Sequence, residues 1–265
     1  MKTLLSIALA LLALVSICPD VARAEVQTKE VAYSAGDSAM QGFLAWDDAL
    51  PGKRPGVLVI HEWWGHNQHA RNQAIRLAKA GYVAFALDMF GKGKVTTHPA
   101  DAQAFVAEAT SDPARLQARF TAGLDQLRHD PRVDAAKIAV IGYCFGGTVA
   151  LNMARAGADV AAVITLHAGL RLSVPAEPGK IKARKILVLT GGADPMVTTE
   201  QLAAFEKEMK AAGANVEVIS YPGAKHAFTN PDADKAGVPA LGYDADADQK
   251  SWQAVLKVLK EVFGS

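Results

Sequence analysis

The stretch of residues 140–150, Val-Ile-Gly-Tyr-Cys-Phe-Gly-Gly-Thr-Val-Ala, constrains the fold more than any other part of the chain. A short, β-branched apolar run at residues 137–141 leads into it, and such a run bounded by polar residues predicts a buried strand. The residues after Gly147 favour a helix. Cys144 is therefore expected on a sharp turn between a strand and a helix.

A sharp strand-to-helix turn of this kind is typical of a nucleophile elbow, here with sulfur in place of oxygen. Gly142 and Gly146 flank the cysteine because side chains at those positions would clash with the neighbouring strand and helix. The helix N-terminus also favours a thiolate over a thiol through its dipole and free N–H groups. An ordinary buried cysteine in a glycine-rich turn is the alternative, and the rest of the chain must decide between them.

The first 24 residues have the layout of a signal peptide. Lys2 supplies a positive charge, residues 4–17 form an apolar run that is short for a membrane span, and residues 22–24, Ala-Arg-Ala, suit a signal peptidase. We therefore expect cleavage before Glu25 and export, to the periplasm or the medium. A lipoprotein attached at Cys18 and a retained anchor helix are less favoured alternatives.

Cleavage leaves residues 25–265, a length that suits one α/β domain, and no linker marks a second domain. Cys144 becomes the only cysteine of the exported chain, so an intramolecular disulfide is excluded and a reactive role for the thiol is favoured. The full chain carries 28 Lys and Arg against 27 Asp and Glu, without basic clusters. We therefore expect no nucleic-acid partner, no stable membrane insertion after cleavage and no cofactor, and we expect a monomer.

Short apolar runs alternate with amphipathic segments along this domain. Strands are expected at residues 26–46 as a pair, 56–60, 82–87, 137–141, 160–166, 186–190 and 216–221, and helices at residues 67–80, 116–127, 202–209 and 252–263. This alternation predicts an α/β fold, a mostly parallel sheet with helices on both faces. Reactive groups gather at the carboxyl ends of the strands in such a fold, and polar loops at residues 92–99 and 229–243 are expected to cover them.

A thiol nucleophile needs a base, and an elbow-type site takes its acid and then its histidine from later in the chain. Two histidines follow Cys144. His167 ends the strand just after the elbow helix and leaves little chain for an acid in between. His226 follows the last predicted strand, so we expect it to be the base.

Asp194 is the expected acid because it follows the strand at residues 186–190 and is held by a proline turn. An ordinary turn aspartate is the alternative. That alternative is weaker here because three predicted strand ends carry three complementary groups in the required order. The other acids between the cysteine and the histidine fall in loops, on helices or within a strand: Asp159, Glu177, Glu200, Glu206, Glu208 and Glu217.

Two backbone N–H groups must hold the developing oxyanion. We expect them from Phe145, directly after the nucleophile, and from Trp63, in the loop after an earlier strand. The same loop contains His61 and His66, which resemble the zinc motif H-E-x-x-H with the second histidine one residue late. On a helix that spacing points the two rings roughly 140° apart. We therefore expect no metal, although a loop site that adds His69 stays open.

These motifs together resemble those of the dienelactone hydrolase family of α/β-hydrolases. The stretches that carry the resemblance are His61-Glu62-Trp63-Trp64-Gly65, Leu87-Asp88-Met89-Phe90, residues 142–147, Gly192-Ala193-Asp194 and His226-Ala227-Phe228. They follow one another over nearly the whole mature chain. The resemblance implies one α/β-hydrolase domain at residues 25–265, without a large cap domain. It also implies hydrolysis of an ester or lactone through an acyl-thioenzyme.

The resemblance further implies that Glu62 contacts the nucleophilic cysteine and accepts its proton when substrate binds. A carboxylate beside the thiol in a dry pocket can keep the sulfur protonated at rest. A neutral thiol resists oxidation better than a thiolate, which suits an exported enzyme. The alternative is that Glu62 caps the following helix or pairs with Arg71.

The substrate is less well defined by the resemblance. Dienelactone-cleaving members of the family hold the substrate carboxylate with arginines, and the corresponding places here carry Lys92 or Lys94 and Asn230. Lysine can neutralise a carboxylate but lacks the bidentate fork of arginine. Nearby aromatic residues indicate an apolar pocket instead. The residues expected to line this pocket are Trp64, Tyr143, His167, Phe228 and Lys92. A histidine of the core with its hydrogen bonds satisfied is the alternative for His167.

We therefore predict an exported hydrolase of carboxylic esters or lactones with a triad of Cys144, His226 and Asp194. Two other classes stay open. One is a non-catalytic thiol sensor or ligand-binding protein on the same scaffold, and the other is an acyltransferase or thioesterase. The ordered acid and histidine disfavour the sensor, because a sensor needs a reactive thiol but not that pair.

Overall fold

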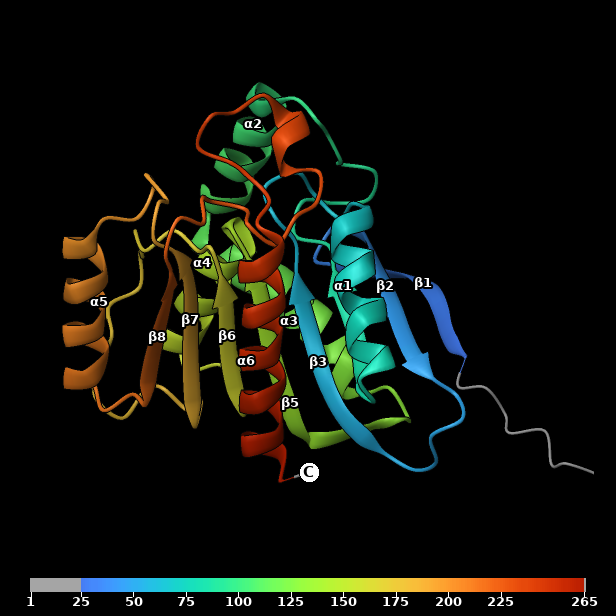
Figure 1. Cartoon of the computed structure of the whole chain (residues 1–265). Coiled ribbons are helices and arrows are strands. Elements are labelled where there is room, and N and C mark those ends of the chain that lie inside the picture. The colour runs from blue at the N-terminus through green and yellow to red at the C-terminus, as the bar shows by residue number, and fades with distance from the viewer. Residues whose placement is uncertain (1–24, 265) are drawn as a thin grey trace, which may run out of the picture.

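The computed structural model describes residues 25–264, and the predicted signal peptide lies outside them. Within these residues an eight-stranded sheet has the strand order β1-β2-β4-β3-β5-β6-β7-β8 (Figure 1). The strands are β1 (Val26–Ala35), β2 (Ser38–Asp47), β3 (Arg54–Ile60), β4 (Val83–Leu87), β5 (Val133–Tyr143), β6 (Ala162–Leu166), β7 (Lys185–Gly191) and β8 (Val216–Tyr221). β1 and β2 form an antiparallel hairpin whose second strand also pairs antiparallel with β4, and the other strands pair in parallel. The predicted mostly parallel α/β sheet is confirmed.

Helices cover both faces of the sheet. α1 (Gln68–Lys79) and α6 (Ala245–Phe263) lie in front of the sheet in Figure 1, and α3 (Pro113–Arg128) and α4 (Phe145–Arg155) lie behind it. α5 (Thr199–Ala211) packs on β8 and joins the same hydrophobic cluster as α3 and α4. A crossover helix on one face or the other is what connects parallel neighbours in a sheet of this kind.

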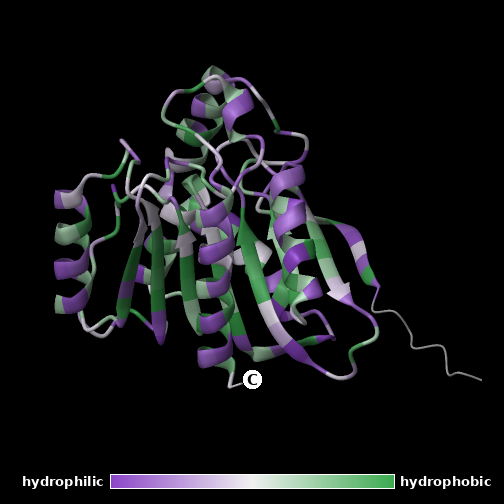
Figure 2. Ribbon diagram, in the orientation of Figure 1, coloured by the Kyte–Doolittle hydropathy of each residue, from purple (hydrophilic) through white to green (hydrophobic). Residues whose placement is uncertain are grey.

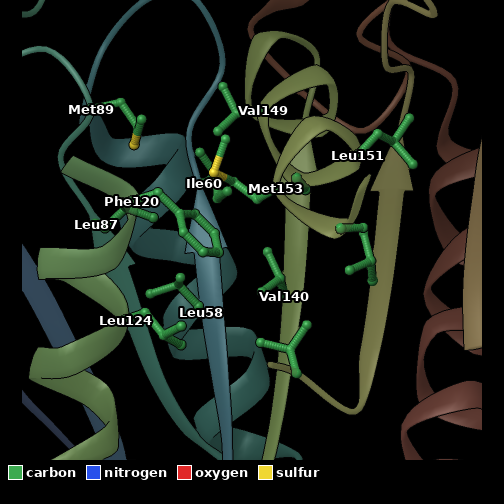
Figure 3. Close-up of a cluster of buried hydrophobic side chains, with 14 of the residues drawn as sticks. Leu58, Ile60, Leu87, Met89, Phe120, Leu124, Val140, Val149, Leu151 and Met153 are labelled. Atoms are coloured by element: carbon green, nitrogen blue, oxygen red, sulfur yellow. The ribbon is translucent and has the colours of Figure 1, made fainter. Parts of the chain in front are cut away.

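The alternation of side chains along the strands builds two hydrophobic cores. Leu58 and Ile60 of β3 pack with Phe120 in the cluster under α3 and α4 (Figure 3), whereas Val57 and Val59 pack on the side of α1 and α6. Each such buried side chain contributes about 1.5–3 kcal/mol. Figure 2 shows the consequence, since hydrophobic residues dominate the strands and hydrophilic residues mark the outward faces of the helices.

The helix α2 (Pro99–Thr110) was not expected from the sequence. Its apolar residues are mostly alanines and form no clear stripe along one face, so hydrophobic periodicity does not reveal it. It lies with the short helix η1 (Ala233–Ala236) above the carboxyl ends of the parallel strands (Figure 1). Short segments therefore occupy the place where a large cap domain would stand. Between residues 25 and 264, no helix has the length and apolar character that a membrane crossing requires.

Candidate active site

Cys144 occupies the turn between β5 and α4, with φ 53° and ψ −118°. A positive φ is costly for a residue with a side chain, and the tight packing around the turn holds it there. A Cβ atom on Gly142 would overlap the carbonyl oxygen of Gly146, and one on Gly146 would overlap the carbonyl oxygen of Ile60. Both glycines are therefore needed for the elbow to close against the end of β3.

His226 and Asp194 meet at the ends of β8 and β7. The Nδ1 atom of His226 lies 2.8 Å from Oδ2 of Asp194, and both side chains are buried. The other carboxylate oxygen accepts the N–H of Met196 at 2.8 Å, which fixes the carboxyl group. The Nε2 atom of His226 has no hydrogen-bond partner among residues 25–264. With Nδ1 tied to Asp194, Nε2 is the nitrogen available to a nucleophile or substrate.

The charge state of His226 is governed by its neighbours. Burial alone would lower the pKa of the imidazole, but the sulfur of Cys144 and the carboxylate of Asp194 favour the protonated ring and raise the pKa to about 10. His226 and Cys144 also line the same cavity. At neutral pH the imidazole of His226 therefore keeps its proton, in a ring that lines the same cavity as the thiol.

Two backbone amides next to the nucleophile are available for an oxyanion. Phe145 is the first residue of α4, where the N–H group has no acceptor within the helix. The N–H of Trp63 donates no hydrogen bond within the described part of the chain. Phe145 and Trp63 both line the cavity together with Cys144. The arrangement can therefore stabilise negative charge that develops on a substrate oxygen.

The cavity over Cys144 has a volume of about 480 Å³. Most of its walls are apolar, and they come from the loop after β3, from α2, α3 and α4, and from the segments after β6, β7 and β8. The principal apolar residues are Trp63, Val106, Leu116, Val149, Met196 and Leu241, and the polar ones include Thr148, Asn152, Arg171 and Ser173. A cavity of this size and character suits a small organic ester or lactone.

None of the five residues expected to line the substrate pocket is among the residues that line this cavity. Trp64, Tyr143 and Phe228 are buried in the cores, and the Tyr143 hydroxyl donates to Gln73 at 3.1 Å. Tyr143 directly precedes the nucleophile, and the alternation along β5 turns its side chain to the opposite face of the sheet. Lys92 is exposed and lies outside the cavity.

His167, the fifth of these residues, packs against the ring of His226. Its Nε2 atom lies 2.9 Å from Oγ1 of Thr229, and its ring centroid lies 5.2 Å from that of His226. Burial and the neighbouring His226 hold the pKa of His167 well below 6.5, so this ring is neutral. His167 therefore supports the position of His226 rather than contacting substrate.

Glu62 is buried directly after His61 at the end of β3. Its Oε2 atom accepts a hydrogen bond of 2.6 Å from the side chain of Asn230, while Oε1 has no partner among residues 25–264. The alternative roles do not hold, because Asn67 caps α1 and Arg71 pairs with Glu30. One carboxylate oxygen of Glu62 is thus free to accept a proton.

The histidines of the same loop are engaged separately. His61 accepts the N–H of Met89 at 3.1 Å, and His69 packs edge-on against Tyr143 with ring centroids 5.5 Å apart. In the described part of the chain no three His, Cys, Asp or Glu side chains are grouped closely enough to hold a metal ion. His61, His66 and His69 therefore do not come together as one set of ligands in the described part of the chain.

The walls from α2, α3 and α4 were missed at the sequence level. Thr148 and Asn152 lie one turn apart on the elbow helix, and polar residues at that spacing just after a nucleophile could have been noticed. Val106 offered no such signal because α2 itself was not expected. Arg171 follows β6 in a segment without periodicity.

The elbow, the buried His226–Asp194 pair and their place at the carboxyl ends of a mostly parallel sheet define an α/β-hydrolase. Comparison with known families refines this class. The model of the dienelactone hydrolase family matches residues 40–263, and the chain belongs to this family. It is accordingly a dienelactone hydrolase-like hydrolase of esters or lactones.

Individual relatives support this assignment. A crystal structure of a dienelactone hydrolase-like promiscuous phosphotriesterase from metagenomic libraries superposes with a TM-score of 0.83, at 35% identity over 89% of this chain and 98% of that chain. A putative carboxymethylenebutenolidase of Yersinia pestis is 28% identical over 84% of each chain. An uncharacterized protein of Caenorhabditis elegans is 37% identical over 58% of this chain and 99% of its own length.

Proposed function

We propose that this ester or lactone hydrolase acts through a catalytic triad of Cys144, His226 and Asp194 and an acyl-thioenzyme. The observation that carries the proposal is the buried hydrogen bond between His226 and Asp194, which leaves Nε2 of His226 without a partner in the described part of the chain. His226 lines the same cavity as Cys144. A cysteine used only for sensing needs no histidine held in one orientation by a buried carboxylate.

In the first half-reaction the thiolate of Cys144 attacks the carbonyl carbon of the substrate. The π electrons move onto the carbonyl oxygen, which accepts hydrogen bonds from the N–H groups of Phe145 and Trp63. When the intermediate collapses, the bond to the leaving oxygen breaks. The imidazolium of His226 gives its Nε2 proton to that oxygen, and an acyl thioester remains.

In the second half-reaction water attacks the thioester. The neutral Nε2 of His226 takes one proton of the water as the oxygen bonds to the acyl carbon. Collapse of this intermediate breaks the carbon–sulfur bond, releases the carboxylic acid and restores the thiolate beside the imidazolium. Asp194 keeps the imidazole ring in one orientation throughout, through its bond to Nδ1.

We propose that Glu62 controls the protonation of the Cys144 thiol. Its unpaired Oε1 atom and its burial make it suited to accept the proton of Cys144 when substrate displaces water from the site. Its single side-chain partner is the neutral amide of Asn230, which holds the carboxylate without cancelling its charge. The loop of Glu62 follows Ile60, whose carbonyl oxygen lies against the elbow glycine Gly146.

The test is turnover of p-nitrophenyl acetate and of a panel of lactones by the unmodified protein, Cys144→Ala and Cys144→Ser. We expect activity to vanish in Cys144→Ala and to fall strongly in Cys144→Ser, because a hydroxyl is a weaker nucleophile at this position. Mass spectrometry of the unmodified protein during turnover should show an acyl adduct on Cys144. Equal rates for all three proteins would contradict the mechanism and favour the thiol sensor.

Export is proposed from the sequence, because the charged start, the apolar run and the Ala-Arg-Ala end at residues 22–24 suit a signal peptidase. The protein expressed in a bacterial host should be recovered from the periplasm or medium with Glu25 as its first residue, as read by N-terminal sequencing. Recovery of the uncleaved chain from the cytoplasm would contradict this.

A further inference from the structure

Two apolar side chains of the cavity, Met196 and Leu241, belong to the same two loops that carry Asp194 and His226. Met196 follows the acid closely, and its backbone N–H donates to Oδ1 of Asp194 at 2.8 Å. Among residues 25–264, these two loops supply only His226, Met196 and Leu241 to the lining of the cavity. Apart from the imidazole, the surface beside the catalytic pair is therefore apolar.

Leu241 is held beside His226 by two backbone hydrogen bonds. The N–H of His226 donates to the carbonyl oxygen of Ala240 at 3.2 Å, and the N–H of Gly242 donates to the carbonyl oxygen of His226 at 3.0 Å. These bonds form a parallel β-bridge between His226 and Leu241, so their backbones lie about 5 Å apart. Because both residues line the cavity, the side chain of Leu241 enters it next to that of the base.

The two side chains differ in how firmly they are held. Leu241 is 4% exposed and packs with Trp64 in a hydrophobic cluster that also includes residues of α2 and η1, which fixes its place. Met196 is 46% exposed, and its unbranched side chain can adapt to groups of different shape. Leu241 thus forms a fixed inner wall, and Met196 forms an adaptable wall at the mouth of the cavity.

The proposed mechanism decides which part of an ester lies against these residues. The carbonyl oxygen must meet the N–H groups of Phe145 and Trp63, and the leaving oxygen must lie about 2.6–3.2 Å from Nε2 of His226. That nitrogen has no other partner in the described part of the chain. The alcohol part of the ester begins at the leaving oxygen, so it extends over the surface beside His226, which Met196 and Leu241 form.

The acyl part of the ester is left with the walls that the helices provide. Val106, Leu116 and Val149 belong to α2, α3 and α4, and none of them lies on the loops of the acid and the base. A substrate thus meets two separate apolar surfaces, one for each side of the scissile bond. A longer alcohol and a longer acyl chain should therefore respond to different residues.

We infer that Met196 and Leu241 form the subsite for the alcohol part of the substrate, and that this subsite favours esters of apolar alcohols with several carbons. Each methylene group buried there strengthens binding by up to about fourfold, from the free energy of removing a CH₂ group from water. The inference rests on the proposed function, since it assigns a substrate preference to the same site. Both residues determine specificity and take no part in bond breaking.

The test uses ethyl acetate, butyl acetate and ethyl butyrate, whose hydrolysis is followed by titration of the released acid. Butyl acetate and ethyl butyrate are isomers that carry the longer chain on opposite sides of the scissile bond. For the unmodified protein we expect kcat/KM for butyl acetate to exceed that for ethyl acetate about three- to tenfold. Ethanol and butanol are nearly equal as leaving groups, so the difference reports contacts of the alcohol with the protein.

Met196→Gln replaces the thioether by an amide of similar length at a half-exposed position, so the fold should tolerate it. The ratio of kcat/KM for butyl acetate to that for ethyl acetate should fall about threefold, and the ratio for ethyl butyrate to ethyl acetate should stay the same. Leu241→Ala should lower the first ratio by a similar factor, with thermal melting to verify that this variant is folded. The matched control is Leu50→Gln, which is 40% exposed outside the cavity and should change neither ratio.

An unchanged ratio of butyl to ethyl acetate in both Met196→Gln and Leu241→Ala would overturn the inference. An equal loss with all three esters would overturn it too, because the variants would then act through Asp194 or His226 and not on the alcohol. Turnover of p-nitrophenyl acetate but not of butyl acetate by the unmodified protein would have the same meaning. These outcomes leave the hydrolase mechanism intact, whereas absence of turnover with all four esters would contradict the proposed function itself.

Discussion

Two regions of opposite character meet at His226. On one side lies the cavity, with apolar walls, about 480 Å³ of open volume and one arginine. On the other side lies a closed group of side chains, here called the buried histidine cluster: His69, Tyr143, His167, Phe228 and Thr229. All five are at least nine-tenths buried, and none lines the cavity.

The difference indicates that the two regions have different roles in catalysis. Polar atoms behind His226 are fixed by hydrogen bonds and ring packing, which suits groups that must hold one geometry for every substrate. The side in front of His226 offers mostly apolar contact, which suits discrimination by size. Changes behind His226 should therefore alter chemistry or stability for all substrates alike, and changes in the cavity should alter the choice among substrates.

The largest effect is expected from Asp194→Asn. The carboxylate holds Nδ1 of His226 from a fully buried position, and an amide there favours the wrong tautomer of the ring. We expect kcat for p-nitrophenyl acetate to fall about 10³- to 10⁴-fold. The exposed Asp159→Asn is the matched control and should keep full activity. A loss of kcat below about tenfold would show that Asp194 is not the acid of the triad.

The same variant should change the titration of His226. Because Asp194 and Cys144 raise the pKa of His226 to about 10, the unmodified protein keeps the imidazolium through neutral pH. Removing either neighbour, in Asp194→Asn or Cys144→Ser, removes a group that stabilises the imidazolium and must lower that pKa. An NMR titration with labelled histidine reads the shift directly, and an unmoved pKa in both variants would contradict the coupling.

Glu62→Gln should have the next largest effect, about a hundredfold in kcat/KM with both short and long esters. The amide keeps the shape of the side chain but cannot accept the proton of Cys144. Alkylation of Cys144 by iodoacetamide should slow in parallel. Glu30→Gln, at the exposed partner of Arg71, is the control. If turnover and alkylation both stay unchanged, Glu62 has a structural role only.

The sequence predicted the layout of the sheet more completely than the cavity. Strands of β-branched residues and capped helices carry their signal locally, so β3, β4, β7 and α1 appeared close to their observed bounds. Cys144, Asp194 and His226 could be selected because each follows a predicted strand in the expected order. The structure brings their elements to one edge of the sheet.

The walls of the cavity depend on packing between distant elements, which no local pattern encodes. Tyr143 and Trp64 stand beside predicted site residues in the sequence, yet their side chains point into closed cores. Val106 lines the cavity from α2, whose alanine-rich sequence shows no amphipathic stripe. A residue that lies near the end of a strand in the sequence is therefore predicted to lie near the site. Its position in the sequence does not tell whether its side chain points into the cavity or into the core.

Val106→Phe tests the cavity side and should have an intermediate effect. The larger ring narrows the space between α2 and the nucleophile. We expect the ratio of kcat/KM for p-nitrophenyl octanoate to that for the acetate to fall about tenfold. Ala104→Phe, on the exposed face of the same helix, should leave the ratio unchanged. An unchanged ratio in Val106→Phe would mean that acyl chains do not extend toward α2.

Thr229→Val tests the buried histidine cluster and should change substrate choice least. It leaves Nε2 of His167 buried without its partner, so the free energy of unfolding in urea should fall by about 1–3 kcal/mol. The octanoate-to-acetate ratio should stay the same, because Thr229 does not touch the cavity. Thr165→Val is the matched control: the Thr165 hydroxyl is buried with no hydrogen-bond partner among residues 25–264, so its removal should cost little or stabilise. A changed octanoate-to-acetate ratio with unchanged stability in Thr229→Val would contradict the idea that the buried histidine cluster affects stability and the cavity affects substrate choice.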